Sequence, residues 1–163
     1  MLFRDLCEFC ELLEKISEKT HKVSLLAEKL RKLDRNDVRP FTFLIIGKIF
    51  PEWQQRSLEV SWATIAQIIM DIFKVSRKEL IERIKATGDI GSAIQSVALR
   101  RKRVKQLTLV SVWRDITVTD IYDALDRISK ICGRDARSRK IAILSSLINA
   151  LSPIELKFFT RII

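Results

Sequence analysis

Apolar side chains recur at helical spacing along most of the chain. In residues 2–18 they return every three or four positions, and residues 22–33 and 154–162 repeat this pattern. Such spacing places the apolar side chains on one face of an α-helix, whereas a half-buried strand alternates with a period of two. We therefore expect amphipathic helices in these stretches and no β-strand.

Two further stretches are apolar on most sides. One runs up to Phe50 and the other covers residues 61–73. Because a helix that is apolar all round is usually buried, we expect the first of these to be central. We expect Asp37 to cap it, Pro40 to lie in its first turn, where a missing N–H costs little, and Pro51 to end it.

Three capping boxes predict additional helix starts. In each, a hydroxyl side chain is followed three residues later by a carboxylate, so that each side chain bonds a free N–H of the first turn. The boxes begin at Ser76, Thr117 and Ser152. We expect the first of these helices to end near Gly88, the second near Cys132 and the third within the last residues.

Shorter stretches complete the pattern. A short helix is expected after Gly91, and another helix covers residues 141–151. Residues 99–105 hold five basic side chains and continue no apolar face, which indicates an exposed segment or a frayed helix end. With eight to ten helices in all, the sequence predicts an all-α, compact multi-helix domain. Two pseudo-symmetric helical halves would fit that count.

The composition agrees with a single helical domain over residues 1–163. The chain has only 4 Gly and 3 Pro, both of which interrupt helices, and its 47% of hydrophobic residues can form a core. The longest apolar run, residues 41–50, is shorter than the roughly 20 residues that span a bilayer. The acidic start does not resemble a signal peptide, so we expect an intracellular protein.

The three cysteines have two interpretations. Cys7 and Cys10 form a C-x-x-C pair, which occurs in zinc sites, but a structural zinc site takes four ligands. The only other candidates are Cys132 and His21. On a helix, both cysteines of the pair lie on the apolar face with Leu6 and Leu13. We therefore expect Cys7 and Cys10 to pack in the core, with metal binding as the alternative.

The positive charge is concentrated in one part of the chain. The net charge is +10, yet residues 1–60 hold 11 basic and 10 acidic side chains, whereas residues 61–163 hold 19 and 10. A one-sided excess of this kind favours a polyanionic partner. The alternative is a solvated basic surface. No Gly-rich phosphate loop, no H-E-x-x-H and no nucleophile beside a base is present, so the sequence alone gives no catalytic site.

Two segments are candidates for phosphate contact. In Thr87, Gly88, Asp89 and Gly91 of the string TGDIG, two glycines around a helix start would let backbone N–H groups approach a phosphate. The alternative is a C-cap followed by an N-cap. Residues 133–140, GRDARSRK, place four basic side chains at an expected helix start, where cations are unfavourable unless an anion binds. The alternative there is a solvated turn.

A third segment, residues 106–113, has the spacing of a partner-binding motif. It runs Q-x-x-hydrophobic-x-x-V-W and resembles the box with which proteins bind a sliding clamp, Q-x-x-hydrophobic-x-x-aromatic-aromatic. Val112 replaces the first aromatic, which weakens the anchor. Alternatively, Leu109, Val112 and Trp113 pack on the core of this domain. As a clamp box, the segment would bind through Gln106, Leu109, Val112 and Trp113.

These strings together resemble the N-terminal DNA-binding domain of archaeal and eukaryotic ATP-dependent DNA ligases. The string DVRPFTFLIIGKIFPEW is similar to the family's D-L-R-P…L-G-x-L-F-P, TGDIG matches T-G-D-x-G, and ITVTDIY resembles L-T-V-x-x-V-Y. The family often has Gly-Ser where Asp135 and Ala136 stand here, a departure that affects side-chain contacts at that point. The matching stretches are residues 1–30, 37–53, 87–91, 116–122 and 139–163.

The resemblance implies a function for this chain. In the family this domain binds nicked double-stranded DNA through its backbone phosphates, using the T-G-D-x-G turn and the later Arg-Lys helix start. Carried over, these residues are Thr87, Gly88, Asp89, Gly91, Arg137, Arg139 and Lys140. Archaeal relatives carry a box for a sliding clamp of the PCNA type between the two, where Gln106 to Trp113 stand.

The resemblance also places the chemistry outside this chain. The family's adenylated lysine lies in K-x-D-G, which the sequence lacks, so ATP and Mg²⁺ would belong to the parent ligase. We expect a non-catalytic, monomeric domain of a cytoplasmic, nucleoid-associated archaeal enzyme acting in replication, repair and recombination, with the family's next motif just after Ile163. The alternatives are a helical module that docks a clamp or scaffold, and a basic protein that binds RNA.

Overall fold

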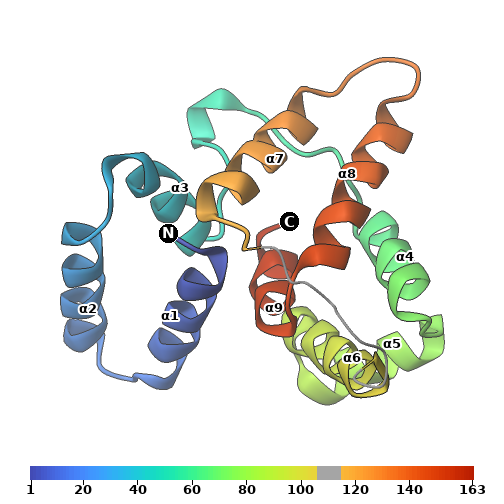
Figure 1. Cartoon of the computed structure of the whole chain (residues 1–163), viewed down its shortest axis with the longest axis horizontal. Coiled ribbons are helices and arrows are strands. Elements are labelled where there is room, and N and C mark those ends of the chain that lie inside the picture. Colours follow the sequence, from blue (N-terminus) through green and yellow to red (C-terminus); the bar gives the residue numbers. More distant parts are fainter. Residues whose placement is uncertain (106–114) are drawn as a thin grey trace.

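The computed structural model describes residues 1–105 and 115–163 (Figure 1). Within these stretches the chain forms nine α-helices and one 3₁₀ helix, and its only extended pairing there is an isolated bridge between Leu2 and Thr117. The all-α prediction is thus confirmed. The helices are α1 (Phe3–Lys15), α2 (Lys19–Arg31), α3 (Arg35–Ile45), η1 (Glu52–Gln54), α4 (Trp62–Phe73), α5 (Arg77–Thr87), α6 (Ile90–Lys105), α7 (Val118–Lys130), α8 (Ala136–Ala150) and α9 (Pro153–Ile162).

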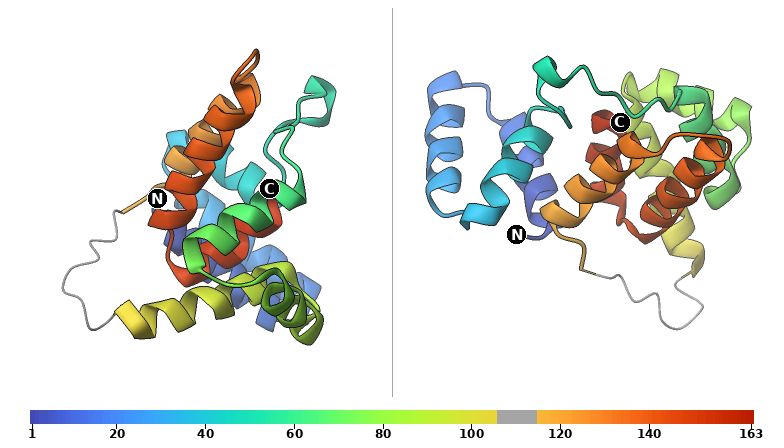
Figure 2. Two further views of the ribbon diagram at one scale, coloured as in Figure 1. Left: turned by 90° about the vertical axis from the view of Figure 1, so that its right-hand side faces the viewer. Right: turned by 90° about the horizontal axis from the view of Figure 1, so that it is seen from above.

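The helix α9 lies between two groups of helices (Figures 1 and 2). It packs against α6 on one side and α1 on the other. Around α1 lie α3 and α7, and around α6 lie α4 and α5, with α8 packed on α4 and α7. The helix α2 lies at the outer edge of the molecule and buries none of its side chains. Pseudo-symmetry between the two groups stays a prediction.

The core is built from side chains that the spacing of apolar residues placed on helix faces. One cluster of buried hydrophobic residues draws on α1, α3, α4, α6, α7, α8 and α9. Its largest fully buried side chains include Phe3, Phe41, Ile69, Ile121 and Phe159. Because α9 contributes buried side chains along its whole length, the last helix completes the core instead of covering it.

The start of α3 differs from the prediction. Asp34 precedes the helix, so Pro40 lies inside it and removes one helical hydrogen bond. Asp37, which we expected as the cap, is 8% exposed, and its carboxylate accepts a hydrogen bond from the amino terminus of Met1 at 2.5 Å and one from Thr119 at 3.3 Å. The aspartate therefore ties α3 to the chain start and to α7.

The end of α3 was also predicted wrongly, because the helix stops at Ile45 instead of Phe50. Gly47 adopts a left-handed conformation with φ +68°. Its N–H donates to the carbonyl oxygen of Leu44 at 3.1 Å, and that of Lys48 donates to Phe43 at 2.9 Å. This is the Schellman motif, in which a glycine ends a helix at low cost, so Gly47 was a stop signal within the apolar run.

Two helices are longer than predicted. The basic residues 99–105, expected as an exposed segment or a frayed end, continue α6 to Lys105, since arginine and lysine are good helix formers and no Gly or Pro interrupts them. Helix α8 begins at Ala136 instead of Ile141, which brings Arg137 and Arg139 into its first turn.

The cysteines follow the packing interpretation. Cys7 is fully buried and Cys10 packs against the core, and burial raises the pKa of both thiols, that of Cys10 to about 11. In the part of the chain that the structure describes, no three His, Cys, Asp or Glu side chains are grouped to hold a metal ion. No helix there is long and apolar enough to cross a membrane.

Candidate nucleic-acid interface

The turn between α5 and α6, residues 87–91, is held by its own polar groups. Gly88 takes a left-handed conformation with φ +66°, which favours glycine, and its N–H donates to the carbonyl oxygen of Ile84 at 2.9 Å. The Thr87 hydroxyl lies 2.9 Å from the carbonyl oxygens of Arg83 and Asp89. An atom added at Gly88 would meet nothing within 4 Å, so its backbone is open to the surface.

Gly91 has a different reason to be glycine. A Cβ atom there would lie 2.3 Å from the carbonyl oxygen of Lys157 in α9, closer than real Cβ atoms come to backbone. The missing side chain therefore lets α6 cross α9 at close range. We expected a phosphate to approach the backbone at Gly91, but α9 occupies that space. Of the two glycines in this turn, Gly88 is the one that faces open space.

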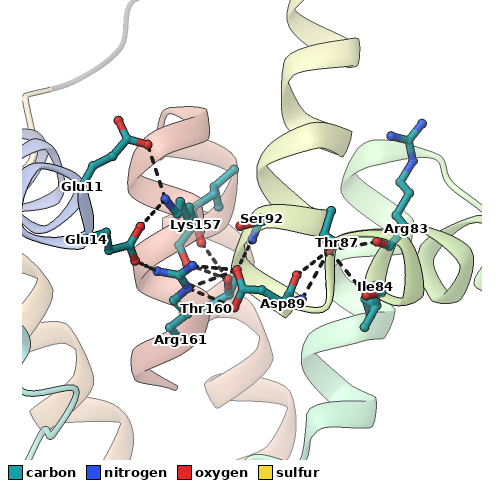
Figure 3. A network of polar contacts seen from close by, with 11 residues as sticks. Glu11, Glu14, Arg83, Ile84, Thr87, Asp89, Ser92, Lys157, Thr160 and Arg161 are labelled. Atoms are coloured by element: carbon teal, nitrogen blue, oxygen red, sulfur yellow. Dashed lines mark hydrogen bonds and ion pairs between the residues drawn. The ribbon is translucent and has the colours of Figure 1, made fainter. Parts of the chain in front are cut away.

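Asp89 caps α6 and is paired with an arginine from the last turn of α9 (Figure 3). Its Oδ2 accepts from the N–H of Ser92 at 2.6 Å and from Nη2 of Arg161 at 2.7 Å. Nε of the same arginine lies 3.1 Å from Oδ1. The turn is thereby fixed to α9 by a two-point ion pair, the geometry in which arginine binds a carboxylate most strongly.

The ion pair continues into α1. Nη1 of Arg161 donates to Glu14, whose other carboxylate oxygen accepts from Lys157 at 2.8 Å. Lys157 also lies 3.4 Å from Glu11. Lys157 is buried in spite of its charge, which its carboxylate partners on α1 offset. Three helices that are distant in sequence thus meet in one network of alternating charges (Figure 3).

The network alters the acidity of its members. Partial burial alone would raise the pKa of Asp89, but hydrogen bonds from Arg161 and Ser92 outweigh it and hold that pKa well below its usual range. For Glu14, burial again raises the pKa and the hydrogen bonds from Lys157 and Arg161 lower it below the ordinary value. Both carboxylates are therefore ionised at neutral pH.

The start of α8 is organised differently. Its first turn contains no acidic residue, and Asp135 makes no capping hydrogen bond. Arg137 and Arg139 are exposed, and Arg139 donates to the carbonyl oxygen of Cys132 at 2.7 Å. Arg137 has no partner among the described residues, so its guanidinium extends from a helix N-terminus into solvent.

Lys140 lies in the same turn but points inward. It is 4% exposed, and its ammonium group donates to the carbonyl oxygen of Leu58 at 2.9 Å and to Glu59 at 3.0 Å. This lysine fastens α8 to the segment before α4. Of the three basic residues expected at this helix start, Arg137 and Arg139 face solvent, and Lys140 serves the fold.

A pocket of about 410 Å³ lies between the starts of α4 and α8. Ser61, which caps α4 by accepting from the N–H of Thr64, forms one wall, and Arg137 and Lys140 form the other. Two helix N-termini therefore border one hollow, which Glu59, the ion-pair partner of Lys140, also lines. Helix N-termini attract anions and the Glu59 carboxylate opposes that attraction, so Arg137 is the cation of this hollow that is left without a partner in the described part of the chain.

The two candidate segments lie at opposite ends of their half of the molecule. Figure 1 shows α5 and α6 at the bottom and the turn before α8 at the top, and Figure 2 agrees. No hydrogen bond or ion pair joins residues 87–91 to residues 134–140 in the described part of the chain. They would act as two separate contacts along an extended ligand.

The whole length of this chain is similar to known proteins. Residues 2–163 match the family described as DNA ligase N terminus. This chain belongs to that family. A DNA ligase of Methanocaldococcus jannaschii is 30% identical over 167 residues, with all of this chain and 28% of the relative covered. A DNA ligase of Archaeoglobus fulgidus is 31% identical over 164 residues, with all of this chain and 29% of the relative covered. The chain thus spans less than a third of the length of these relatives.

The residues expected to bind a sliding clamp in this ligase N-terminal domain lie outside the described residues. They are Gln106, Leu109, Val112 and Trp113. The described chain leaves α6 at Lys105 and resumes at Asp115, two residues before Thr117, which pairs with Leu2. The clamp box therefore stays a prediction from the sequence.

Sequence reasoning missed the side chains that hold the α5–α6 turn of the ligase domain. None of Arg161, Lys157 and Glu14 was singled out. A signal existed, because Lys157 and Arg161 are four residues apart on a largely buried helix, and two basic groups on one face of such a helix need acidic partners.

Proposed function

We propose that this chain binds double-stranded DNA without reading its sequence, as the DNA-binding domain of an ATP-dependent DNA ligase. The observation that carries the proposal is the match of residues 2–163 to the ligase N terminus. The charge supports it, because nearly all of the net +10 lies in residues 61–163, which include both candidate segments. Phosphates supply most of the affinity in binding of this kind.

The two segments would bind phosphates by different means. The first turn of α6, beside the open surface at Gly88, offers N–H groups, whereas the start of α8 offers the helix dipole with Arg137 and Arg139. Their separation lets the domain contact the duplex at two places. A nick relieves the stiffness of the duplex between such contacts, so we expect nicked DNA to be the preferred ligand.

We assign nick sealing to the remainder of the parent protein. The chain lacks K-x-D-G, so the lysine that accepts the nucleotide, together with ATP and Mg²⁺, would lie outside it. This domain would contribute affinity and position. We further propose that the parent is a monomeric, cytoplasmic and nucleoid-associated enzyme of DNA replication, repair and recombination.

Binding measured against salt tests the proposal. The 163-residue chain is titrated onto labelled nicked duplex, intact duplex and single-stranded RNA at several salt concentrations. If about five phosphates are neutralised, the logarithm of affinity should fall with the logarithm of salt with a slope of roughly −4 to −5. A preference for RNA, or DNA binding with a slope near zero, would contradict the proposal.

Clamp docking is a second proposed function, supported by the spacing of residues 106–113. Trp113 would be the main anchor, since buried aromatic residues dominate such interfaces. Trp113→Ala should then abolish binding to a PCNA-type clamp in a calorimetric titration while the melting temperature and DNA affinity stay unchanged. If the tryptophan packs on this domain instead, the substitution should destabilise the fold by about 3–5 kcal/mol.

A further inference from the structure

The cap of α6 carries a charge that opposes DNA binding. Asp89 places a carboxylate beside the N–H groups of the first turn of α6, where a DNA phosphate would have to approach. An ionised carboxylate and a phosphate repel each other, and both would compete for the same positive end of the helix. An unpaired Asp89 would therefore weaken the contact that the turn is proposed to make.

Arg161 offsets this charge from the opposite side. Its Nε and Nη2 both reach the Asp89 carboxylate, at 3.1 and 2.7 Å, so the pair is bidentate. Both side chains are about two-thirds buried, with exposed fractions of 29% and 33% for Arg161 and Asp89. At this burial the attraction is screened less than at a fully exposed surface, so the pair persists in moderate salt.

All three nitrogens of Arg161 already donate to carboxylates of this chain. Besides the two that reach Asp89, Nη1 donates to Glu14, and the guanidinium lies over the ring of Phe158 at 5.1 Å (Figure 3). An arginine whose charge is matched in this way by two carboxylates acts on a phosphate chiefly through the groups that it positions and neutralises.

We propose that Arg161 is a positioning residue for DNA binding, which neutralises Asp89 and fixes the α5–α6 turn without touching the DNA. This inference rests on the proposed DNA-binding function. It assigns a role in affinity to the last turn of α9, which lies outside both candidate segments. It also explains why an aspartate is tolerated at a helix start that is to meet a phosphate.

The test is a set of variants measured for DNA affinity and thermal stability. Arg161→Gln should weaken nicked-duplex binding about fivefold, because it leaves Asp89 charged and unpaired. Asp89→Asn should bind as well as the wild type or better, since asparagine keeps the cap and removes the charge. The double variant should return to within about twofold of the wild type, although it lacks the ion pair. Arg161→Lys, which keeps the charge, should lose less than Arg161→Gln.

The outcomes separate this inference from the function on which it rests. If the wild type binds no DNA, the proposed function fails. If the wild type binds and Arg161→Gln binds equally well, only the positioning role fails. A direct contact between Arg161 and DNA would leave the double variant as weak as Arg161→Gln and reduce the salt slope by about 0.9, which would overturn the inference. If Arg161→Gln does not fold, Asp89→Asn still decides, because weakened binding by that folded variant contradicts the inference.

Discussion

The α5–α6 turn and the start of α8 both place polar side chains at a helix N-terminus, but they use them in opposite ways. In the turn, Thr87, Asp89 and Gly91 are all engaged in hydrogen bonds, an ion pair or close packing within the chain. At the start of α8, the side chain of Arg137 extends into solvent without a partner among the described residues. The side chains of a family motif can therefore serve the fold, so that only the backbone of the motif is left to contact a ligand.

This difference determines what mutations can reveal. Substitution of Gly91 should change stability and binding together, because the close crossing that it allows both shapes the turn and holds α6 on α9. Substitutions of the exposed arginines should change binding alone. Lys140 is the exception among the basic residues at the start of α8, since it is buried.

Replacing Gly91 should damage the fold most. Gly91→Val places a Cβ atom against the Lys157 carbonyl, and backbone cannot move aside easily, so we expect a loss of at least about 3 kcal/mol in the free energy of unfolding. Urea denaturation measures it. Gly88→Asn is the matched control, because asparagine tolerates a positive φ and meets no neighbour there. An unchanged urea midpoint with lost DNA binding would restore the phosphate interpretation of Gly91.

Replacing Lys140 should cost stability and spare binding. Lys140→Met keeps the buried stem but leaves the Leu58 carbonyl without its donor, so we expect a loss of about 2 kcal/mol in urea denaturation. Glu59 adds little, because its side chain is 73% exposed and regains water. The DNA affinity of the folded variant should stay within about twofold of the wild type. Weaker binding at an unchanged urea midpoint would show that the lysine contacts DNA.

Acid should destabilise the turn through Asp89. Since its pKa is lowered on folding, the ion pair stabilises the protein above the unfolded pKa of about 4, and that contribution is lost as the pH falls below it. Discounted for partial exposure, the loss is about 1 kcal/mol. The urea midpoint of the wild type should therefore fall more between pH 5 and pH 2 than that of Asp89→Asn. If the urea midpoints of the two proteins fall equally with pH, Asp89 is not the source of the acid sensitivity.

Replacing Arg137 should leave stability unchanged. Arg137→Gln removes one exposed cation, so we expect DNA affinity to fall about fivefold and the salt slope to decrease by about 0.9, with the same melting temperature. Arg4→Gln is the control, since it removes the same charge from the exposed face of α1. Equal losses in both variants would indicate a general charge effect and no specific contact at α8.

The helices could be predicted because their signals are local. The capping box at Thr117 forms as expected, with both reciprocal bonds present, and at Ser152 the Glu155 carboxylate accepts from the Ser152 N–H at 2.7 Å. The buried face of α7, including Ile121, Leu125 and Ile128, follows the apolar spacing of the sequence. Each of these features depends on residues within one or two turns of one another, which a single sequence contains in order.

The site residues depended on contacts between distant parts of the chain. Arg161 meets Asp89 across 72 positions, and Lys140 meets Glu59 across 81. Spacing along a helix reveals neither pairing, so the sequence could not distinguish the arginine that is paired with Asp89 from the lysine that is buried against Leu58 and Glu59. The close crossing at Gly91 was hidden for the same reason, because the atom that excludes a side chain belongs to α9.

The central place of α9 has a consequence for how the protein is made. Synthesis is vectorial, and the surfaces of α1 and α6 that face α9 are finished long before residues 153–162 leave the ribosome. Until then the faces of α1 and α6 that pack on α9 stay uncovered, so the nascent chain holds open apolar surfaces through most of its translation. When α9 emerges and packs, it covers both surfaces at once. Productive folding of this domain therefore awaits the emergence of its final helix, and rare codons placed just after α9 would lengthen the time available for that closure.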